Sequence, residues 1–170
     1  MCIRDRAEAD AADSGSAAVR AAVSEGGESL GMFQLGHAFE NQTEQQIDLD
    51  LGIRYHYEFE ATASPDSGFP DAKIGLKLYA RGPRGRLLRE LTLLEHSTEQ
   101  GPAQRHADDR VNFSLTLAPG EVAQVFLAGR VAVEISQGRS ASGSLALSHV
   151  QMEVATRAAP PVLPPEHGQP

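Results

Sequence analysis

The stretch 47–61 reads IDLDLGIRYHYEFEA, and it decides the fold class. Every odd-numbered position from Ile47 to Ala61 is apolar, and every even-numbered position is polar or glycine. Successive side chains of a β-strand point to opposite faces, so this period of two predicts a strand with one buried and one solvated face. The strand is longer than most, and Gly52 predicts a bend within it.

Strand signals separated by turn residues continue along the chain. Apolar and polar residues alternate over 111–117 and 144–154, and a largely apolar run covers 122–135. Within the last stretch the apolar residues shift from odd to even positions near Ser148 and His149, which predicts a β-bulge. The sequence therefore predicts an all-β fold: an antiparallel β-sandwich, jelly-roll-like in one form, of about seven or eight strands, with a β-barrel as the alternative.

The segment 73–94 predicts a β-hairpin. Residues 82–85 read GPRG, which suits a type I turn with proline at its second position. This turn would place Lys77 directly opposite Glu90, a favourable cross-strand pair. The alternative is a helix, because the leucines between positions 87 and 94 also fit helical spacing.

The two ends of the chain differ in composition from the middle. Residues 1–6, MCIRDR, resemble translated sequencing-adapter sequence and are set apart from the fold. Residues 7–29 are expected to be mostly disordered or loosely ordered, with a loose helix or an edge strand beginning near Ala17. The single sandwich domain is expected over 30–156. Residues 157–170 are rich in proline and predict a disordered tail or linker.

Composition excludes several classes of function. The chain has 15 basic and 23 acidic residues, a net charge of −8, which argues against a nucleic-acid partner and an anionic membrane surface. It lacks an apolar run long enough for a transmembrane helix, so no membrane insertion is expected. Cys2, the one cysteine, lies in the adapter-like segment, which leaves no thiol chemistry. No serine-nucleophile, P-loop or dinucleotide motif is present.

The polar side of the strand 47–61 provides the first candidate site. Arg54, His56 and Glu58 follow one another there at intervals of about 7 Å. His56 and Glu58 could exchange a proton or bind a metal if a neighbouring strand supplied a third group. The favoured interpretation is an ordinary solvated face of mixed charge.

The loop 64–71 provides a candidate metal site. Its carboxylates, Asp66 and Asp71, offer the oxygen ligands that calcium prefers. The loop lacks the regular spacing of a calcium-binding loop, so an ordinary turn is the favoured interpretation. No other cofactor is expected.

The hairpin provides the third candidate. Lys73, Lys77, Tyr79 and Arg81 share the side facing away from the apolar residues, and they could hold an acidic polysaccharide or an acidic protein partner. The favoured interpretation is protection of an edge strand, since charges on an edge discourage pairing with other chains. Tyr79 by itself is a poor platform for a sugar.

Together these observations predict a non-catalytic, exported domain, extracellular or periplasmic, used for surface binding, adhesion or assembly. One alternative is a polysaccharide-acting enzyme on a β-sandwich, with two carboxyls about 5–9 Å apart. The other is a carbohydrate-binding module. Asn41 and Asn112 begin sequences that match glycosylation acceptors.

Overall fold

The structure, a computed structural model, describes residues 6–12, 15–64, 71–136 and 138–158, with side chains from residue 15 onward. The described residues form strands and two short 3₁₀ turns, and no helix among them is long and apolar enough to cross a bilayer. In chain order the elements are β1 (Arg6–Ala12), β2 (Ser16–Ser24), β3 (Gly27–Glu40), β4 (Ile47–Ala63), β5 (Ala72–Arg81), η1 (Pro83–Gly85), β6 (Leu87–Ser97), η2 (Thr98–Gln100), β7 (Ala103–Leu117), β8 (Val122–Ile135) and β9 (Ser140–Ala158).

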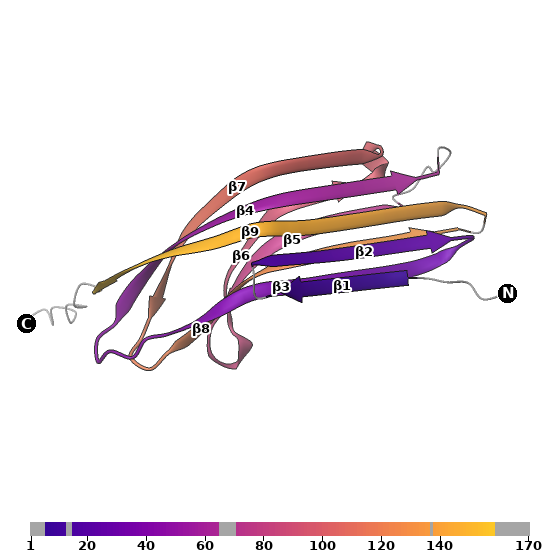
Figure 1. Ribbon diagram of the computed structural model, residues 1–170. Helices are drawn as coiled ribbons and strands as arrows, with labels where there is room; N and C mark the ends of the chain where they lie inside the picture. The colour runs from indigo at the N-terminus through magenta and orange to yellow at the C-terminus, as the bar shows by residue number, and fades with distance from the viewer. Residues whose placement is uncertain (1–5, 13–14, 65–70, 137, 159–170) are drawn as a thin grey trace, which may run out of the picture.

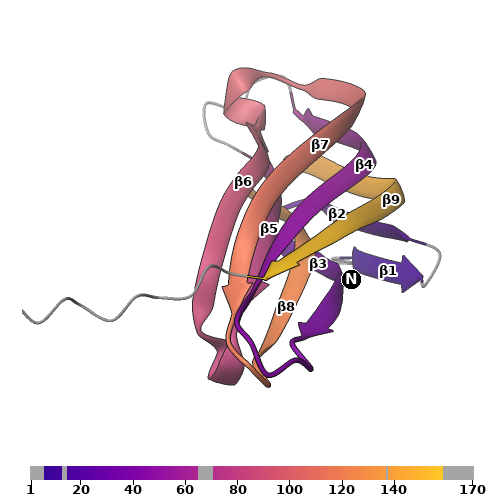
Figure 2. The same ribbon diagram turned by 90° about the vertical axis from the view of Figure 1, so that its left-hand side faces the viewer.

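The strands build two antiparallel sheets that pack face to face (Figures 1 and 2). One sheet has the order β1-β2-β9-β4-β7 and the other β3-β8-β5-β6. Strand β2 pairs with β9, β3 with β8, β4 with β7 and β5 with β6, which is the pattern of one long hairpin rolled into two layers. This nested pairing is that of a jelly roll. The β-sandwich prediction is confirmed, and the barrel alternative is wrong because two separate sheets form.

The alternating stretch forms β4, which lies between β9 and β7 in the first sheet. Its odd-numbered residues fill the space between the sheets, and Ile53 is completely buried. Burying these apolar side chains is the main driving force for packing the two sheets together. Gly52 does not interrupt the strand, which runs continuously over 17 residues.

The bulge predicted near Ser148 and His149 is confirmed. The register of β9 against β4 shifts between Arg54 and His56, and His149 adopts a left-handed backbone with φ of 54°. Before the bulge the buried residues of β9 are odd-numbered, and after it the inward residues are even-numbered. One extra residue therefore keeps both halves of the strand facing the core.

The segment 7–29 differs from its prediction. It contains β1, β2 and the start of β3 instead of a loosely ordered chain. In β2 the residues Ala17, Val19, Ala21 and Val23 are buried against the core. Small alanines and serines give only a weak strand signal, and the pairing of β2 with β9 supplies the missing order. The described residues form nine strands. Strand β1 is additional to the prediction, and the other eight match the predicted number.

The C-terminal boundary of the predicted domain moves slightly. Strand β9 continues to Ala158, two residues beyond the expected boundary at 156. The tail predicted over 157–170 therefore begins later, and its remainder lies outside the described residues.

The hairpin is confirmed in place of the helix, but its predicted register is wrong. Lys77 lies opposite Thr92, not Glu90, because the turn places Leu87 opposite Arg81 and Leu88 is then an extra residue in a bulge of β6. Leu93 forms a second bulge beyond Lys77. The turn also differs from type I, since Arg84 adopts a left-handed conformation with φ of 57°. Turn sequence alone could not reveal the two bulges.

Asn41 anchors the loop between β3 and β4. Its side chain is fully buried, and its Nδ2 donates hydrogen bonds to the carbonyls of Gln45 (2.8 Å) and Leu117 (3.0 Å). Its Oδ1 accepts from the backbone N–H of Thr43 at 3.0 Å. The amide is thus fully engaged, so the match of Asn41 to a glycosylation acceptor does not correspond to an accessible site.

Candidate binding surfaces

The predicted binding residues fall on opposite sides of the sandwich. Arg54, His56 and Glu58 lie on the outer side of the first sheet, and the hairpin residues lie on the outer side of the second. We call the first surface the polar face; it comprises Arg54, His56, Glu58, His106, Asp108, Arg110, His149 and Glu153. We call the second surface the basic face; it comprises Lys73, Lys77, Tyr79, Arg81, Phe126 and Arg130.

The position of β5 changes how the basic face is interpreted. Strand β5 lies between β8 and β6, so both of its edges are hydrogen-bonded. Charges on a central strand cannot serve as edge protection, because no edge is present there. The interpretation favoured from the sequence is therefore wrong, and the cations of β5 need another explanation.

Two aromatic rings stack against each other in the middle of the basic face. Tyr79 on β5 pairs directly with Phe126 on β8, and their ring centroids are 5.4 Å apart with an interplanar angle of 26°. The guanidinium carbon of Arg81 lies 5.7 Å from the centroid of Tyr79 and 5.4 Å from that of Phe126. Both rings are half-buried, so each keeps part of its surface open to a ligand.

Cations line the two central strands of the basic face. Lys73, Lys77 and Arg81 project from β5, and Arg130 lies on β8 opposite Gly75. Lys77 binds Glu90 at 2.6 Å, and this hydrogen bond, with the charge of Glu90, raises the pKa of the lysine. The other three cations have no ion pair within the described part of the chain.

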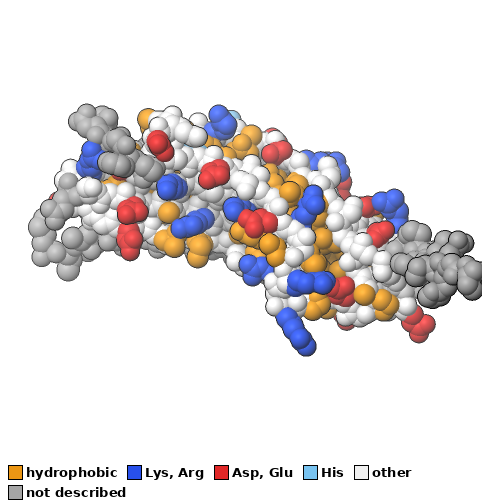
Figure 3. Space-filling view, turned by 180° about the vertical axis from the view of Figure 1, so that it is seen from behind, with side chains coloured by type: hydrophobic (Ala, Val, Ile, Leu, Met, Phe, Trp, Pro, Cys, Tyr) orange, Lys and Arg blue, Asp and Glu red, His pale blue; other side chains and the backbone are white. Residues whose placement is uncertain are grey.

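Seen from behind Figure 1, Lys and Arg side chains lie among hydrophobic side chains (Figure 3). The basic face thus mixes charge with apolar surface. Phe126 and Arg130 were missed from the sequence, because they join the site only through the pairing of β5 with β8. The largely apolar run 122–135 predicts a strand, but not which strand lies beside it.

The polar face satisfies much of its own charge. Arg54 and Arg110 both bind Glu153, each at 3.1 Å. Asp50 accepts a hydrogen bond from Ser114 at 2.7 Å and pairs with Arg157; the hydrogen bond is the larger cause of the lowered pKa of Asp50. These pairs balance charges of the first sheet within the sheet itself.

Neighbouring strands do supply further groups around His56. Its Nδ1 lies 3.0 Å from the carboxylate of Asp108 on β7. The ring centroids of His106 and His149 lie 6.3 Å and 6.5 Å from that of His56. Glu58 lies across from His106 instead of joining His56. Across the described ranges, no three such side chains are arranged to hold a metal ion.

The candidate calcium residues are not brought together in the described structure. Asp66 lies outside the described residues. Asp71 is 2 % exposed at the start of β5, where its N–H donates to Thr98 Oγ1 at 3.0 Å. Its Oδ2 has no hydrogen-bond partner. Calcium binding at this loop stays a prediction.

Three shallow depressions on the described surface bear on the alternative that the protein is an enzyme. One, of about 600 Å³, lies on the polar face beside Asp108 and Asp109. These consecutive carboxylates point to opposite sides of β7: Asp108 contacts His56, and Asp109 accepts a hydrogen bond from the inward Tyr55 at 3.3 Å. They therefore do not face each other as a catalytic pair. A smaller depression, with Glu44 and Arg157 in its lining, holds a single carboxylate.

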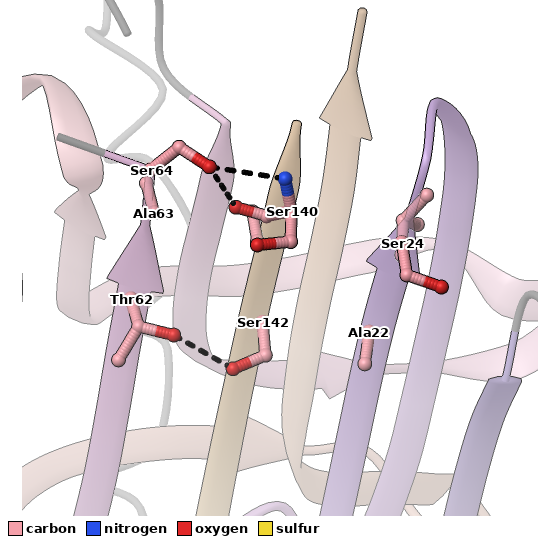
Figure 4. Close-up of a pocket in the computed structure, with 9 residues that line it drawn as sticks. Ala22, Ser24, Thr62, Ala63, Ser64, Ser140 and Ser142 are labelled. Atoms are coloured by element: carbon pink, nitrogen blue, oxygen red, sulfur yellow. Dashed lines mark hydrogen bonds between the residues drawn. The ribbon is translucent and has the colours of Figure 1, made fainter. Parts of the chain in front are cut away.

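The remaining depression, of about 510 Å³, lies where β2 and β4 end and β9 begins (Figure 4). The hydroxyl of Ser64 makes two hydrogen bonds of 3.1 Å to the backbone of Ser140, and the side chains of Thr62 and Ser142 bind each other at 2.8 Å. Its lining holds hydroxyl groups and small apolar residues, with no histidine or carboxylate beside the hydroxyls. This arrangement lacks a base that would activate a serine.

The fold places the chain among the antiparallel β-sandwich proteins of jelly-roll topology. No known family matches the sequence, and no curated protein matches it. Five solved chains match, among them one from the "Structure of infectious bursal disease virus Gx strain", with 14% identity and a TM-score of 0.29. That match covers 91% of this chain and 32% of the viral chain, so this chain spans about a third of its length. A likeness this weak supports no functional argument.

Proposed function

We propose that this domain is a non-catalytic binding module that attaches to an anionic ligand through the basic face, in surface binding, adhesion or assembly. The observation behind the proposal is the central position of β5. A central strand has no edge to protect, so its outward cations are most simply explained by a partner. The jelly-roll fold hosts many unrelated functions and selects none of them.

The contrast between the two faces supports the same choice. On the first sheet, Arg54 and Arg110 of the polar face and the nearby Arg157 are engaged with carboxylates of the same sheet. On the basic face Lys73, Arg81 and Arg130 have no such partner among the described residues. Unpaired cations attract an anionic ligand more strongly than cations that already have a carboxylate neighbour.

Export to an extracellular or periplasmic location is part of the proposal. The chain has a single cysteine, Cys2, which suits a fold that does not depend on thiols. The partner is expected to be an acidic polysaccharide or protein rather than nucleic acid, since the chain carries a net charge of −8. A signal sequence in the full gene upstream of these residues would support export, and a cytosolic start there would contradict it.

The test is retention on immobilised polyanions, with dextran sulfate and poly-L-glutamate as probes. The wild-type chain should be retained at low salt and released as salt rises, because screening weakens the attraction. The variant Lys73→Glu/Arg130→Glu should lose retention. The matched control Arg20→Glu/Arg54→Glu lies on the other sheet and has the same net charge of −12, since each change lowers the wild-type −8 by two.

The control should be retained almost as well as the wild-type chain. Equal loss in both variants would show that overall charge, not the basic face, governs binding. Absence of retention of the wild-type chain on every polyanion would contradict the proposed function.

A further inference from the structure

The aromatic pair of the basic face points to a more specific ligand. We propose that Tyr79 and Phe126 form a stacking platform for the sugar rings of an acidic polysaccharide, whose carboxylate or sulfate groups bind Arg81 and the neighbouring cations. This inference rests on the proposed function, because it assigns the ligand of the same face.

The platform contacts Arg81, but its neighbours on β3 and on one side along β8 are small. On β3 the residue opposite Phe126 is Gly36. A Cβ at Gly36 would lie 2.2 Å from the carbonyl oxygen of Val125 and 2.4 Å from Cβ of Phe126, so no larger residue fits there. Next to Phe126 along the same side of β8 is Ala128. The ring surface of Phe126 is therefore not covered from β3 or from this side of β8.

Arg81 provides the anion-binding group at the platform. Its guanidinium lies over both rings, where attraction to the ring faces holds a flexible side chain in place. A guanidinium donates two parallel hydrogen bonds to a carboxylate or sulfate. A sugar ring stacked on the platform would bring its acidic substituent to this group.

The remaining cations extend the site along β5. Outward residues of a strand repeat at about 7 Å. Along the paired strands β5 and β8, Lys73, then Arg130 and then Lys77 come at successive outward positions that lead to the platform. Together with Arg81 they cover a length of roughly 27 Å. A linear polymer with regularly spaced anionic groups can follow this path, whereas a small anion would use only one cation.

Amide side chains add the chemistry that hydroxyl groups need. Gln34 on β3 and Gln124 on β8 are exposed on the same surface and flank the platform rows. Amides both donate and accept hydrogen bonds, as sugar hydroxyls do. Aromatic, amide and cationic groups together match a sugar acid better than an acidic peptide, which offers no flat apolar ring face for the platform.

Other polyanions match the face less well. Peptides that add a strand bind at a free sheet edge, and the platform lies in the middle of a sheet. Nucleic-acid bases also stack on aromatic rings. Their backbone has about one charge per 3.4 Å of each strand, and Glu90 and Glu95 on β6 border the cations. A polymer of lower charge density meets less repulsion from these carboxylates.

The test compares three soluble probes by affinity: polygalacturonate, poly-L-glutamate and oligo-dT. The wild-type chain should bind polygalacturonate about tenfold more tightly than the other two. Tyr79→Leu should reduce the affinity for polygalacturonate about tenfold and change poly-L-glutamate binding less than about twofold. Phe126→Leu, which keeps apolar volume in place, should act in the same direction.

Arg81→Ala should weaken binding of both anionic polymers. The control is Val154→Ala, which removes an exposed apolar side chain from β9 in the other sheet and should leave all affinities unchanged. Circular dichroism of each variant shows whether the fold is retained.

Three outcomes would contradict this inference, and they bear differently on the proposed function. Equal binding of polygalacturonate and poly-L-glutamate, insensitive to Tyr79→Leu, would overturn the platform and leave the anion-binding face intact. Absence of binding to every probe would overturn both. Preference for oligo-dT would overturn the polysaccharide assignment in favour of nucleic acid.

Discussion

At the scale of single residues, the structure gives buried polar groups well-defined tasks. Asn41 fixes the loop after β3 and the end of β7, because its amide binds backbone carbonyls from both. The sequence showed only a polar loop with a glycosylation-like motif. Burial of that amide depends on β7, which lies far away in the chain, so local residues could not reveal it.

Replacing Asn41 with Ala should lower the free energy of unfolding by about 2–3 kcal/mol, since the carbonyl of Leu117 would remain buried without its partner. The matched control is Asn112→Ala, which begins the same type of motif but lies exposed on the polar face. It should change stability by less than about 1 kcal/mol. Urea unfolding of both variants is the measurement, and equal losses would contradict the role of Asn41.

Tyr55 provides a test at alkaline pH. Burial, followed by the nearby charge of Asp109, raises the pKa of its phenol well above the usual value of 10.0. A group whose pKa is raised on folding stabilises the fold fully below the pKa of the unfolded chain. This stability is lost as pH rises from that pKa to the higher pKa of the folded chain. Wild-type stability should therefore fall above about pH 10.

The stability of Tyr55→Phe should fall less over the same pH range, because phenylalanine has no proton to lose. At neutral pH the variant should lose no more than about 1 kcal/mol, the worth of one hydrogen bond. Urea unfolding midpoints at about pH 8 and pH 11 would show the difference. Parallel losses in the wild-type chain and the variant would contradict the effect of burial on Tyr55.

At the scale of elements, alternation predicted β4 and the bulge of β9 well. In both cases the signal is local, since the period of two and its shift by one lie within a single strand. The register of the hairpin failed for the opposite reason. Leu88 and Leu93 are bulged out of a ladder whose partner is β5, and nothing in their own sequence marks them as extra.

The bulge of β9 leads to a deletion experiment. His149 is the extra residue, so deleting it should join the two halves of β9 in regular alternation, with Leu147 and Val150 both still facing inward. The fold should survive, and the free energy of unfolding should fall by less than about 2 kcal/mol. Removal of a residue with a left-handed backbone offsets part of this loss.

The matched control is deletion of Ser144, which lies in the regular part of β9. That deletion should turn Leu145 and Leu147 away from the core and lower the free energy of unfolding by about 3 kcal/mol or more. Thermal or urea unfolding distinguishes the two. A larger loss from deleting His149 than from deleting Ser144 would contradict the description of the bulge.

At the scale of the whole molecule, the sequence predicted strands but not their neighbours. The sequence predicts one stripe of outward residues, Lys73, Lys77, Tyr79 and Arg81, and favours an edge position for their strand. The jelly-roll pairing puts β8 beside β5 and so adds Phe126 and Arg130 to the stripe. Long-range pairing is set by the packing of all strands together, which no local pattern contains.

The same pairing separates the two candidate surfaces. The polar face and the basic face lie on opposite outer sides of the sandwich, so a ligand bound to one does not touch the other. If the ligand binds at the basic face, its effects should appear there and not on the polar face. Effects on the polar face would contradict this prediction.

The most direct test is an amide chemical-shift titration of the isotope-labelled chain with polygalacturonate fragments. We predict that the shifts concentrate on β5 and β8, around Tyr79, Arg81, Phe126 and Arg130. Shifts concentrated around His56 and Asp108, or no shifts at millimolar ligand, would contradict the account.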